Sequence, residues 1–311
     1  MKNVFLGIDT SNYTTSLALF CENEFVCSKK GLFVRSGEKG VRQSEAVFQH
    51  TKNIPELMED VFSKARAKFG EDLKISAVGV SQTPRRREGS YMPCFLAGVA
   101  SASSIAFSHD VPLYRFSHQE GHIRAAILGS GFNSSLSRFY SFHLSGGTCE
   151  LLSVEKDNIG YCAEIISDSA DITLGQLIDR TGVLLGLDFP CGPELEKLAE
   201  KSLLIPDVSI KSTRSINLSG FENKVQKMIE IGTPAQDVAS FVFGVCVSAV
   251  RVMLENAEEK LPILFSGGGS SSHILAENVL KFSNAYFAPP VYSADNAIGI
   301  AALCQDNVLR R

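Results

Sequence analysis

The sequence predicts an α/β fold made of two domains with similar topology. A pattern of strand, tight polar or glycine turn, strand, turn and strand begins near Val4 and occurs again near Phe139. Helical segments and further strands alternate after each copy, which is typical of α/β proteins. The 311 residues are enough for two domains of ordinary size. We expect a ligand in a cleft between the domains, at the ends of the strands.

The first domain is expected over residues 1–110. Short apolar runs bounded by turn residues predict its strands. The strands expected up to residue 116 are 4–8, 15–20, 25–28, 75–81 and 113–116. Helices are expected over about 43–68, with a break or second start at Pro55, and over 92–108.

The second domain is expected over residues 111–294, with the last helix, about 295–311, packing back on the first domain. Its expected strands are 138–145, 148–154, 160–166 and 264–266. Its expected helices are 174–185, one from Pro193, one from Thr233 with that threonine as its cap, and 272–282.

The charge balance excludes a protein that coats nucleic acid generally. Lys and Arg number 30 against 34 Asp and Glu, a net charge of −4. Contact with nucleic-acid phosphates is therefore expected only at local patches, for which solvated loop charge is the alternative. The patches carry Lys29, Lys30, Arg85, Arg86 and Arg87.

Cysteine usage and hydropathy predict a cytoplasmic protein that does not enter a membrane. The eight cysteines are scattered without a CxxC motif, which favours reduced thiols in the cytosol. The opening residues, MKNVFLGIDTS, are too short an apolar run for a signal peptide. The longest apolar stretch, 241–250, ends at Arg251 and is too short to cross a bilayer.

Asp9 and Ser11 are predicted as catalytic residues. The strand that ends at Asp9 leads into a hairpin rich in hydroxyl groups, GIDTSNYTT. Amides and hydroxyls in such a turn can bind phosphate, and a carboxylate at a strand end can hold a metal ion or water. The alternative is an ordinary polar hairpin.

Two Ser-Gly-Gly turns that directly follow apolar strands predict a nucleotide site. They are 145–147 and 266–268. Glycine lets the backbone approach a flat or anionic ligand, and the free amides bind oxygen. Asp179 and the turn PCGPE at Gly192 add a hydrogen-bond acceptor and a helix N-terminus. A solvated acid and a structural turn are the alternative for this last pair.

His118 and His122 in the motif HQEGH predict a metal site. Residues four apart share one helix face, and two imidazoles there can bind one divalent ion. Asp295 is the best candidate for a distant third ligand, because it follows an extended stretch and opens the last helix. Ser117 and Glu120 predict a capping box. The glutamate lies off the histidine face, so it cannot be the base of an HExxH protease. The alternative is a structural pair of histidines.

These motifs, in this order, resemble the TsaD/Gcp family, the transferases that make threonylcarbamoyladenosine in tRNA, once labelled glycoproteases (peptidase M22). The resemblance covers nearly the whole chain, through GIDTS, HQEGH, LSGG, GQLIDRTGVLLGLDFPCGPELEKLA, FSGGG and ADNAIGIA. It implies two actin-like ATPase domains (ASKHA, ribonuclease H-like) with a metal ion, iron or zinc, and ATP or an acyl-adenylate between them. It also implies tRNA as substrate and partner proteins of a modification complex.

The resemblance implies that a threonylcarbamoyl group moves from its adenylate to a tRNA adenosine, with AMP leaving. His118, His122 and Asp295 match the metal ligands, and the metal would polarise the carbonyl of the adenylate. The residues matched to the nucleotide or adenylate are Ser145, Gly146, Gly147, Asp179, Gly192, Gly267, Gly268 and Ser272.

Four positions and one loop depart from the family pattern and predict a divergent paralogue. Tyr13 and Thr14 stand where the family has an acidic pair, Thr148 stands for a histidine and Ser272 for an asparagine. The segment 83–89, TPRRREG, replaces a glycine-proline-glycine loop. Two other functions stay open: a nucleotide-binding relative with another acceptor or a regulatory role, and a metalloprotease, which the misplaced glutamate disfavours.

Overall fold

The computed structural model describes residues 1–11, 13–34, 41–202, 204–293 and 297–310, and it forms two compact units. Unit 1 consists of Met1–Leu128, Lys156–Cys162 and Ala294–Arg311. Unit 2 consists of Gly129–Glu155 and Ala163–Ser293. Unit 1 thus continues to residue 128, whereas the sequence analysis placed a boundary near residue 110. That the chain consists of two domains stays a prediction.

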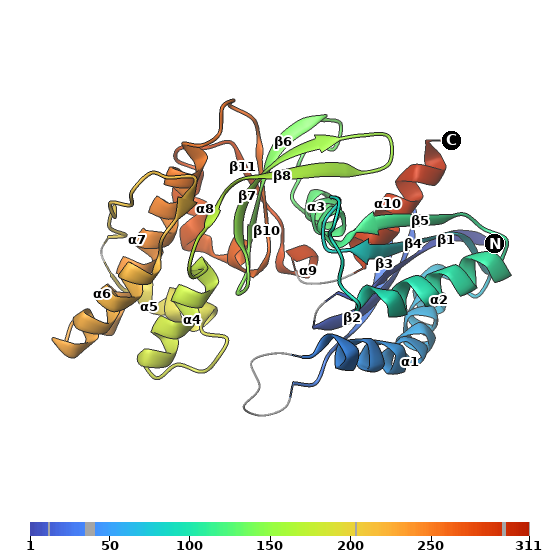
Figure 1. The fold of residues 1–311 in the computed structure, drawn as a ribbon, viewed down its shortest axis with the longest axis horizontal. Helices are drawn as coiled ribbons and strands as arrows, with labels where there is room; N and C mark the ends of the chain where they lie inside the picture. The colour runs from blue at the N-terminus through green and yellow to red at the C-terminus, as the bar shows by residue number, and fades with distance from the viewer. Residues whose placement is uncertain (12, 35–40, 203, 294–296, 311) are drawn as a thin grey trace. The chain divides into compact units, whose positions relative to one another are not determined.

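Unit 1 is built on a five-stranded sheet in the order β3-β2-β1-β4-β5 (Figure 1). The strands are β1 (Lys2–Asp9), β2 (Thr14–Cys21), β3 (Glu24–Gly31), β4 (Leu73–Thr83) and β5 (Leu113–Ser117). β1 and β3 both pair antiparallel with β2, while β1, β4 and β5 run parallel to one another. The opening hairpins and the later strands expected from the sequence are therefore present.

Helices pack on this sheet because side chains alternate between its two faces. The helices of unit 1 are α1 (Gln43–Phe69), α2 (Phe95–Ser108), α3 (His118–Gly129) and α10 (Ile298–Leu309). Val4, Leu6 and Ile8 of β1 belong to an apolar core shared with α1 and α2. Gly7 faces the start of α10, where a Cβ would lie 2.5 Å from the carbonyl oxygen of Ala297. Glycine at this position lets the helix approach the strand closely.

Unit 2 repeats this topology in a sheet ordered β11-β10-β6-β7-β8-β9. Its strands are β6 (Arg138–Leu144), β7 (Cys149–Lys156), β8 (Tyr161–Ser169), β9 (Ser215–Ile216), β10 (Ile263–Ser266) and β11 (Ala285–Phe287). β6 pairs antiparallel with β7 and parallel with β10, which in turn pairs parallel with β11. The repeat in the sequence is thus a repeat of strand order, with β9 added at one edge.

Helix α7 (Ala235–Leu254) forms the centre of the core of unit 2. The other helices are α4 (Leu174–Leu184), α5 (Gly192–Ala199), α6 (Ser219–Glu230), the 3₁₀ turn Gly268–Ser271, α8 (His273–Val279) and α9 (Pro290–Ser293). Within the described residues, α7 alone is long and apolar enough to cross a membrane, but 83% of its apolar window is buried inside the protein. Such burial is typical of a core helix.

Two local predictions are wrong and one helix was missed. α1 runs without a break through the exposed Pro55, because packing along β2 and β3 outweighs the hydrogen bond lost there. α6 was not expected, since Val225 is its one fully buried residue. α7 begins at Ala235, with Pro234 rather than Thr233 at the cap position and no side-chain capping bond.

Candidate functional site

Asp9, Ser11 and His118 meet at the carboxyl edge of the sheet in unit 1. Because β1, β4 and β5 are parallel, their carboxyl ends share one edge, where α/β proteins commonly bind ligands. Oδ2 of Asp9 lies 3.0 Å from Nδ1 of His118 and accepts a hydrogen bond from Oγ of Ser11 at 2.9 Å. The topology therefore brings together two residues that are 109 positions apart in sequence.

The imidazoles of His118 and His122 converge. Their Nε2 atoms lie 2.9 Å apart, and the ring centroids lie 4.3 Å apart. When Nδ1 of His118 donates its proton to Asp9, Nε2 is left as an acceptor or metal ligand. Two converging imidazole nitrogens suit iron or zinc. Asp295 lies outside the described residues, and within the part described no three metal-binding side chains cluster.

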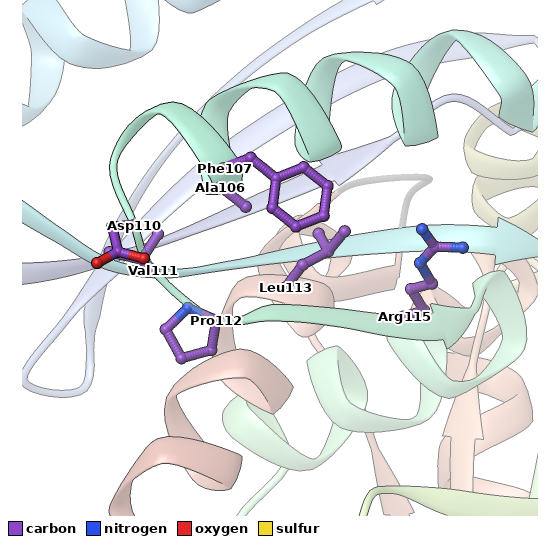
Figure 2. A pocket seen from close by; sticks show the side chains of 7 residues that line it. All are labelled: Ala106, Phe107, Asp110, Val111, Pro112, Leu113 and Arg115. Atoms are coloured by element: carbon purple, nitrogen blue, oxygen red, sulfur yellow. The ribbon is translucent and has the colours of Figure 1, made fainter.

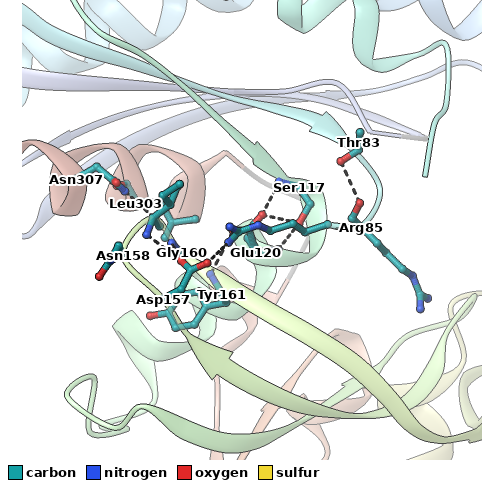
Figure 3. A network of polar contacts seen from close by, with 12 residues as sticks. Thr83, Arg85, Ser117, Glu120, Asp157, Asn158, Gly160, Tyr161, Leu303 and Asn307 are labelled. Atoms are coloured by element: carbon teal, nitrogen blue, oxygen red, sulfur yellow. Dashed lines mark hydrogen bonds and ion pairs between the residues drawn. The ribbon is translucent and has the colours of Figure 1, made fainter. Parts of the chain in front are cut away.

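Glu120 has a structural role in unit 1 (Figure 3). Its side chain is buried, and Oε2 accepts hydrogen bonds from N and Oγ of Ser117, both at 2.8 Å. Oγ of Ser117 accepts in turn from Glu120 N, so the predicted capping box is confirmed. Oε1 accepts from Tyr161 N at 3.2 Å and lies 3.6 Å from Nη1 of Arg86. These contacts occupy both oxygens and leave none for a catalytic base.

A buried polar network fixes the hairpin between β1 and β2. Oγ1 of Thr10 donates to the carbonyl oxygen of Cys94 at 3.0 Å and accepts from Gly98 N at 3.2 Å. Oγ1 of Thr15 lies 2.8 Å from Nδ1 of His50 on α1. Burial lowers the pKa of His50 to about 4, so this imidazole is neutral at pH 7. These bonds tie the hairpin that carries the candidate catalytic carboxylate to α1 and to the start of α2.

Unit 2 holds a cavity of about 600 Å³, a size that suits a nucleotide. It lies at the carboxyl edge of the parallel pair β6 and β10, where both Ser-Gly-Gly turns follow their strands. The expected nucleotide contacts that line it are Ser145, Gly146, Asp179, Gly192, Gly268 and Ser272. Gly147 and Gly267 do not line it. Gly267 instead has a φ of +88° against the backbone of Leu144, a conformation that glycine adopts without strain.

Hydrogen bonds between helices and turns shape this cavity. Oγ1 of Thr173 closes a capping box at the start of α4 and donates to the carbonyl oxygen of Gly146 at 2.9 Å. Oδ1 of Asp179 accepts from Cys191 N at 2.9 Å, which links α4 to the start of α5. One oxygen of this carboxylate is therefore used by the fold.

Glu196 and Gly175 line the cavity and were missed by the sequence analysis. Oε1 of Glu196 accepts from Oγ of Ser272 at 2.6 Å and from Ile274 N at 2.8 Å. The usable signal was spacing, because Glu196 follows Gly192 by one helical turn and shares its face. A Cβ on Gly175 would lie 2.7 Å from the carbonyl oxygen of Ser145, so the turn and α4 touch there.

Two of the predicted basic contacts are already paired with acids. Nζ of Lys30 lies 2.7 Å from Glu56, and Nη1 of Arg86 lies 2.6 Å from Asp157. Lys29 and Arg87 are exposed, and Arg85 is partly exposed.

A second cavity, of about 580 Å³, lies in unit 1 between the end of α2 and β5 (Figure 2). Its lining includes Phe107, Asp110, Leu113 and Arg115. None of the predicted site residues that the structure describes lines it, so it lies apart from the candidate site.

Comparison with known proteins confirms the family resemblance. The sequence profile of the family TsaD, tRNA N6-adenosine threonylcarbamoyltransferase, matches residues 23–302. A tRNA N6-adenosine threonylcarbamoyltransferase of Methanopyrus kandleri is 24% identical over 96% of this chain and 86% of its own length. One from Thermus thermophilus is 29% identical over 95% of this chain and 90% of its own.

Solved structures agree on the fold. HypF of T. kodakarensis superposes with a TM-score of 0.57 at 13% identity, over 99% of this chain and 48% of that one. A ROK family glucokinase from Streptomyces griseus, in complex with glucose and AMPPNP, gives 0.51 at 11% identity, over 97% and 99%. Identities this low concern the fold alone, and they confirm the expected actin-like α/β fold.

Proposed function

The chain belongs to the TsaD family, and on that premise we propose that it transfers a threonylcarbamoyl group from its adenylate to the N6 amine of a tRNA adenosine. In the proposed reaction a C–N bond forms at the carbamoyl carbon and the C–O bond to the phosphate breaks. AMP leaves, and the proton lost from the amine passes to solvent. The chain is expected to act in the cytoplasm, together with partner proteins.

The observation that carries the proposal is the cavity of unit 2. Its lining includes glycines of the two turns that follow the parallel strands β6 and β10, a position where α/β proteins commonly bind nucleotides. We assign the adenosine moiety to this cavity, with Asp179 and Glu196 as acceptors for hydroxyl or amino groups. Gly268 and Ser272 would lie against the same ligand.

We assign a divalent metal, iron or zinc, to Nε2 of His118 and of His122, with Asp295 as the third ligand. The fit rests on the two converging nitrogens and on the carboxylate of Asp9, which orients His118 through Nδ1. When bound, the metal supplies Lewis-acid polarisation of an acyl carbonyl. Ser11 donates to Asp9 and keeps that carboxylate oriented, so we assign both residues to the reaction centre.

We assign tRNA contact to Lys29, Lys30, Arg85 and Arg87, since phosphate contacts supply much of the affinity for nucleic acid. Arg86, expected as a contact from the sequence, is assigned instead to holding its turn through Asp157. A regulatory, non-catalytic relative was the alternative raised by Tyr13, Thr14, Thr148 and Ser272. Among the described residues no feature favours it, and the relatives named above are transferases.

A transfer assay tests the proposal. The chain is incubated with partner proteins, synthetic threonylcarbamoyl-adenylate and tRNA from cells that lack the modification, and the nucleosides are measured by mass spectrometry. We expect modified adenosine with the wild-type chain and less than about a hundredth of it with His118→Ala. Asp188→Asn, an exposed acid outside the cavity, is the matched control. No modified nucleoside, in the presence of an active family member as standard, would exclude tRNA as acceptor.

A further inference from the structure

The segment from Thr83 to Tyr91 lies beside the candidate reaction centre. It follows β4 and therefore starts at the same carboxyl edge as Asp9 and His118. The carbonyl oxygen of Pro84 accepts from Gln119 N at 3.1 Å, one residue after His118. We call the segment 83–91 the arginine turn; it contains the segment 83–89, which by the family resemblance takes the place of a glycine-proline-glycine loop.

The arginine turn is held by its own hydrogen bonds. Oγ1 of Thr83 donates to Arg85 O at 3.1 Å, and Arg85 N donates to Oγ of Ser90 at 3.0 Å. Backbone bonds from Arg87 N to Arg85 O and from Ser90 N to Arg87 O close it further. These bonds order the backbone of the turn, so a partner would not have to order the backbone on binding.

Arg86 and Arg87 have different environments. Arg86 forms ion pairs with other residues of unit 1: its Nη1 atom lies 2.6 Å from Asp157 and 3.6 Å from the buried Glu120. Arg87 is exposed, and its guanidinium makes no hydrogen bond or ion pair within the described part of the chain. Figure 3 shows the Arg85 side chain pointing away from the Glu120 network. Arg86 therefore holds the turn against Asp157, while Arg87 is exposed to solvent.

An exposed aromatic ring completes the arginine turn. Tyr91 is 63% exposed, although aromatic side chains are usually buried. Tyr91 follows Arg87 by four residues in the same turn. Exposed rings and arginines together are typical of sites for single-stranded nucleic acids, since bases stack on the ring and the guanidinium binds phosphate.

We propose that Arg87 and Tyr91 bind the single-stranded RNA next to the target adenosine, Arg87 at a backbone phosphate and Tyr91 by stacking on a base, with Arg86 as the positioning residue of the turn. The proposal rests on the proposed function, because it takes RNA as the acceptor. It gives the neighbours Arg86 and Arg87 different roles: Arg87 binds RNA and Arg86 holds the turn in place.

Direct binding tests this without the transfer reaction. Affinity of the full chain for fluorescently labelled, unmodified tRNA is measured by anisotropy over a range of salt concentrations. Arg87→Glu is expected to weaken binding about three- to tenfold at 0.1 M salt and to flatten the salt slope by about 0.7. Tyr91→Ala is expected to weaken it roughly five- to tenfold, and Tyr91→Phe to restore it.

Two matched controls come from the same elements. Lys74→Glu reverses an exposed charge at the opposite end of β4, and Phe107→Ala removes an exposed ring at the far end of α2. Both are expected to bind RNA as the wild-type chain does. Arg86→Gln is expected to lower the melting temperature of the free protein, which Arg87→Glu leaves unchanged.

The outcomes separate this proposal from the proposed function. Wild-type affinity in Arg87→Glu and Tyr91→Ala, equal losses in the two controls, or no RNA binding by the wild-type chain would each overturn the proposal. Retained RNA affinity with loss of a partner protein would assign the arginine turn to protein docking instead. RNA affinity that depends on both residues, without any transfer by the wild-type chain, would support the contact and refute the function.

Discussion

Asp179 offers a substitution that separates ligand binding from folding. Oδ1 of this residue accepts from Cys191 N, while the carboxylate also lines the cavity of unit 2. Asp179→Asn can keep the acceptor for Cys191 but replaces the other oxygen with an NH₂ group, which cannot accept a hydrogen bond. The variant should therefore fold normally and bind nucleotide poorly.

The size of the effect follows from the type of bond. A hydrogen bond from a ribose hydroxyl to a carboxylate contributes about 1.5–3 kcal/mol, so its loss weakens nucleotide binding roughly 10- to 150-fold. Asp179→Ala should show the same loss of affinity. It also leaves Cys191 N without its acceptor, which costs about 1–3 kcal/mol of unfolding free energy. At about 2–4 °C per kcal/mol, the Ala variant should melt about 2–12 °C lower than the wild-type chain.

Calorimetric titration with ATP gives the affinity, and differential scanning calorimetry gives the melting temperature. Asp188→Asn is the control, because it removes the same charge from an exposed position near the same helix start. Wild-type nucleotide affinity in Asp179→Asn would refute the assignment of this carboxylate to the ligand. An unchanged melting temperature in Asp179→Ala would refute its structural bond.

Three further predictions concern pH, glycine contact and the buried glutamate. Burial lowers the pKa of His50 from 6.5 to about 4, so between these values the unfolded chain binds a proton that the folded chain does not. The unfolding free energy should thus fall by up to about 3 kcal/mol as the pH drops through this window. Urea denaturation at several pH values should show His50→Asn losing that dependence; equal pH slopes for both proteins would contradict it. Gly175→Ala should weaken nucleotide binding about tenfold in the same titration, because the new methyl group displaces the Ser145 carbonyl. Gly220→Ala, where nothing lies within 4 Å of the new methyl, should bind normally, and similar affinities of the two variants would refute the contact. Glu120→Gln should lower the unfolding free energy, measured in thermal melts, by about 1–3 kcal/mol, because the buried carboxylate holds Ser117 and Tyr161. A variant of normal stability that has lost a peptide-cleaving activity of the wild-type chain would show that Glu120 is a catalytic base instead.

Much of the architecture could be predicted because the two hairpins carry strong local signals. Short apolar runs bounded by tight turns predicted most strands of both units, although β9 and β11 were missed, and the strand-end motifs pointed to Asp9 and the turn 145–147 as ligand-binding positions. The parallel pairing of β1 with β4 and of β6 with β10 brings motifs that are far apart in the chain to the same sheet edge. The order of the motifs in the sequence does not show this proximity. The capping box of Ser117 was predictable for the same reason, since it depends on three-residue spacing.

What escaped prediction depends on tertiary contacts. The helix α1 continues through Pro55 because its apolar face packs on two strands. Helix propensity, which describes each residue in isolation, does not include this packing free energy. Gly267 looked like a ligand contact, but its positive φ and the close approach of Leu144 explain the glycine without a ligand. Glu196 was overlooked because an acid on a helix surface is usually solvated; its spacing from Gly192 was the one signal in the sequence, and its bonds to Ser272 and Ile274 depend on the packing of α8.

The claim on which the account depends is that the cavity of unit 2 receives the adenosine of the adenylate. A crystal structure with a non-hydrolysable analogue of threonylcarbamoyl-adenylate tests it most directly. We predict density for the adenosine beside Asp179, Gly192 and Gly268, with the phosphate against the Ser145 turn. An analogue bound elsewhere, with this cavity left to solvent, would contradict the account.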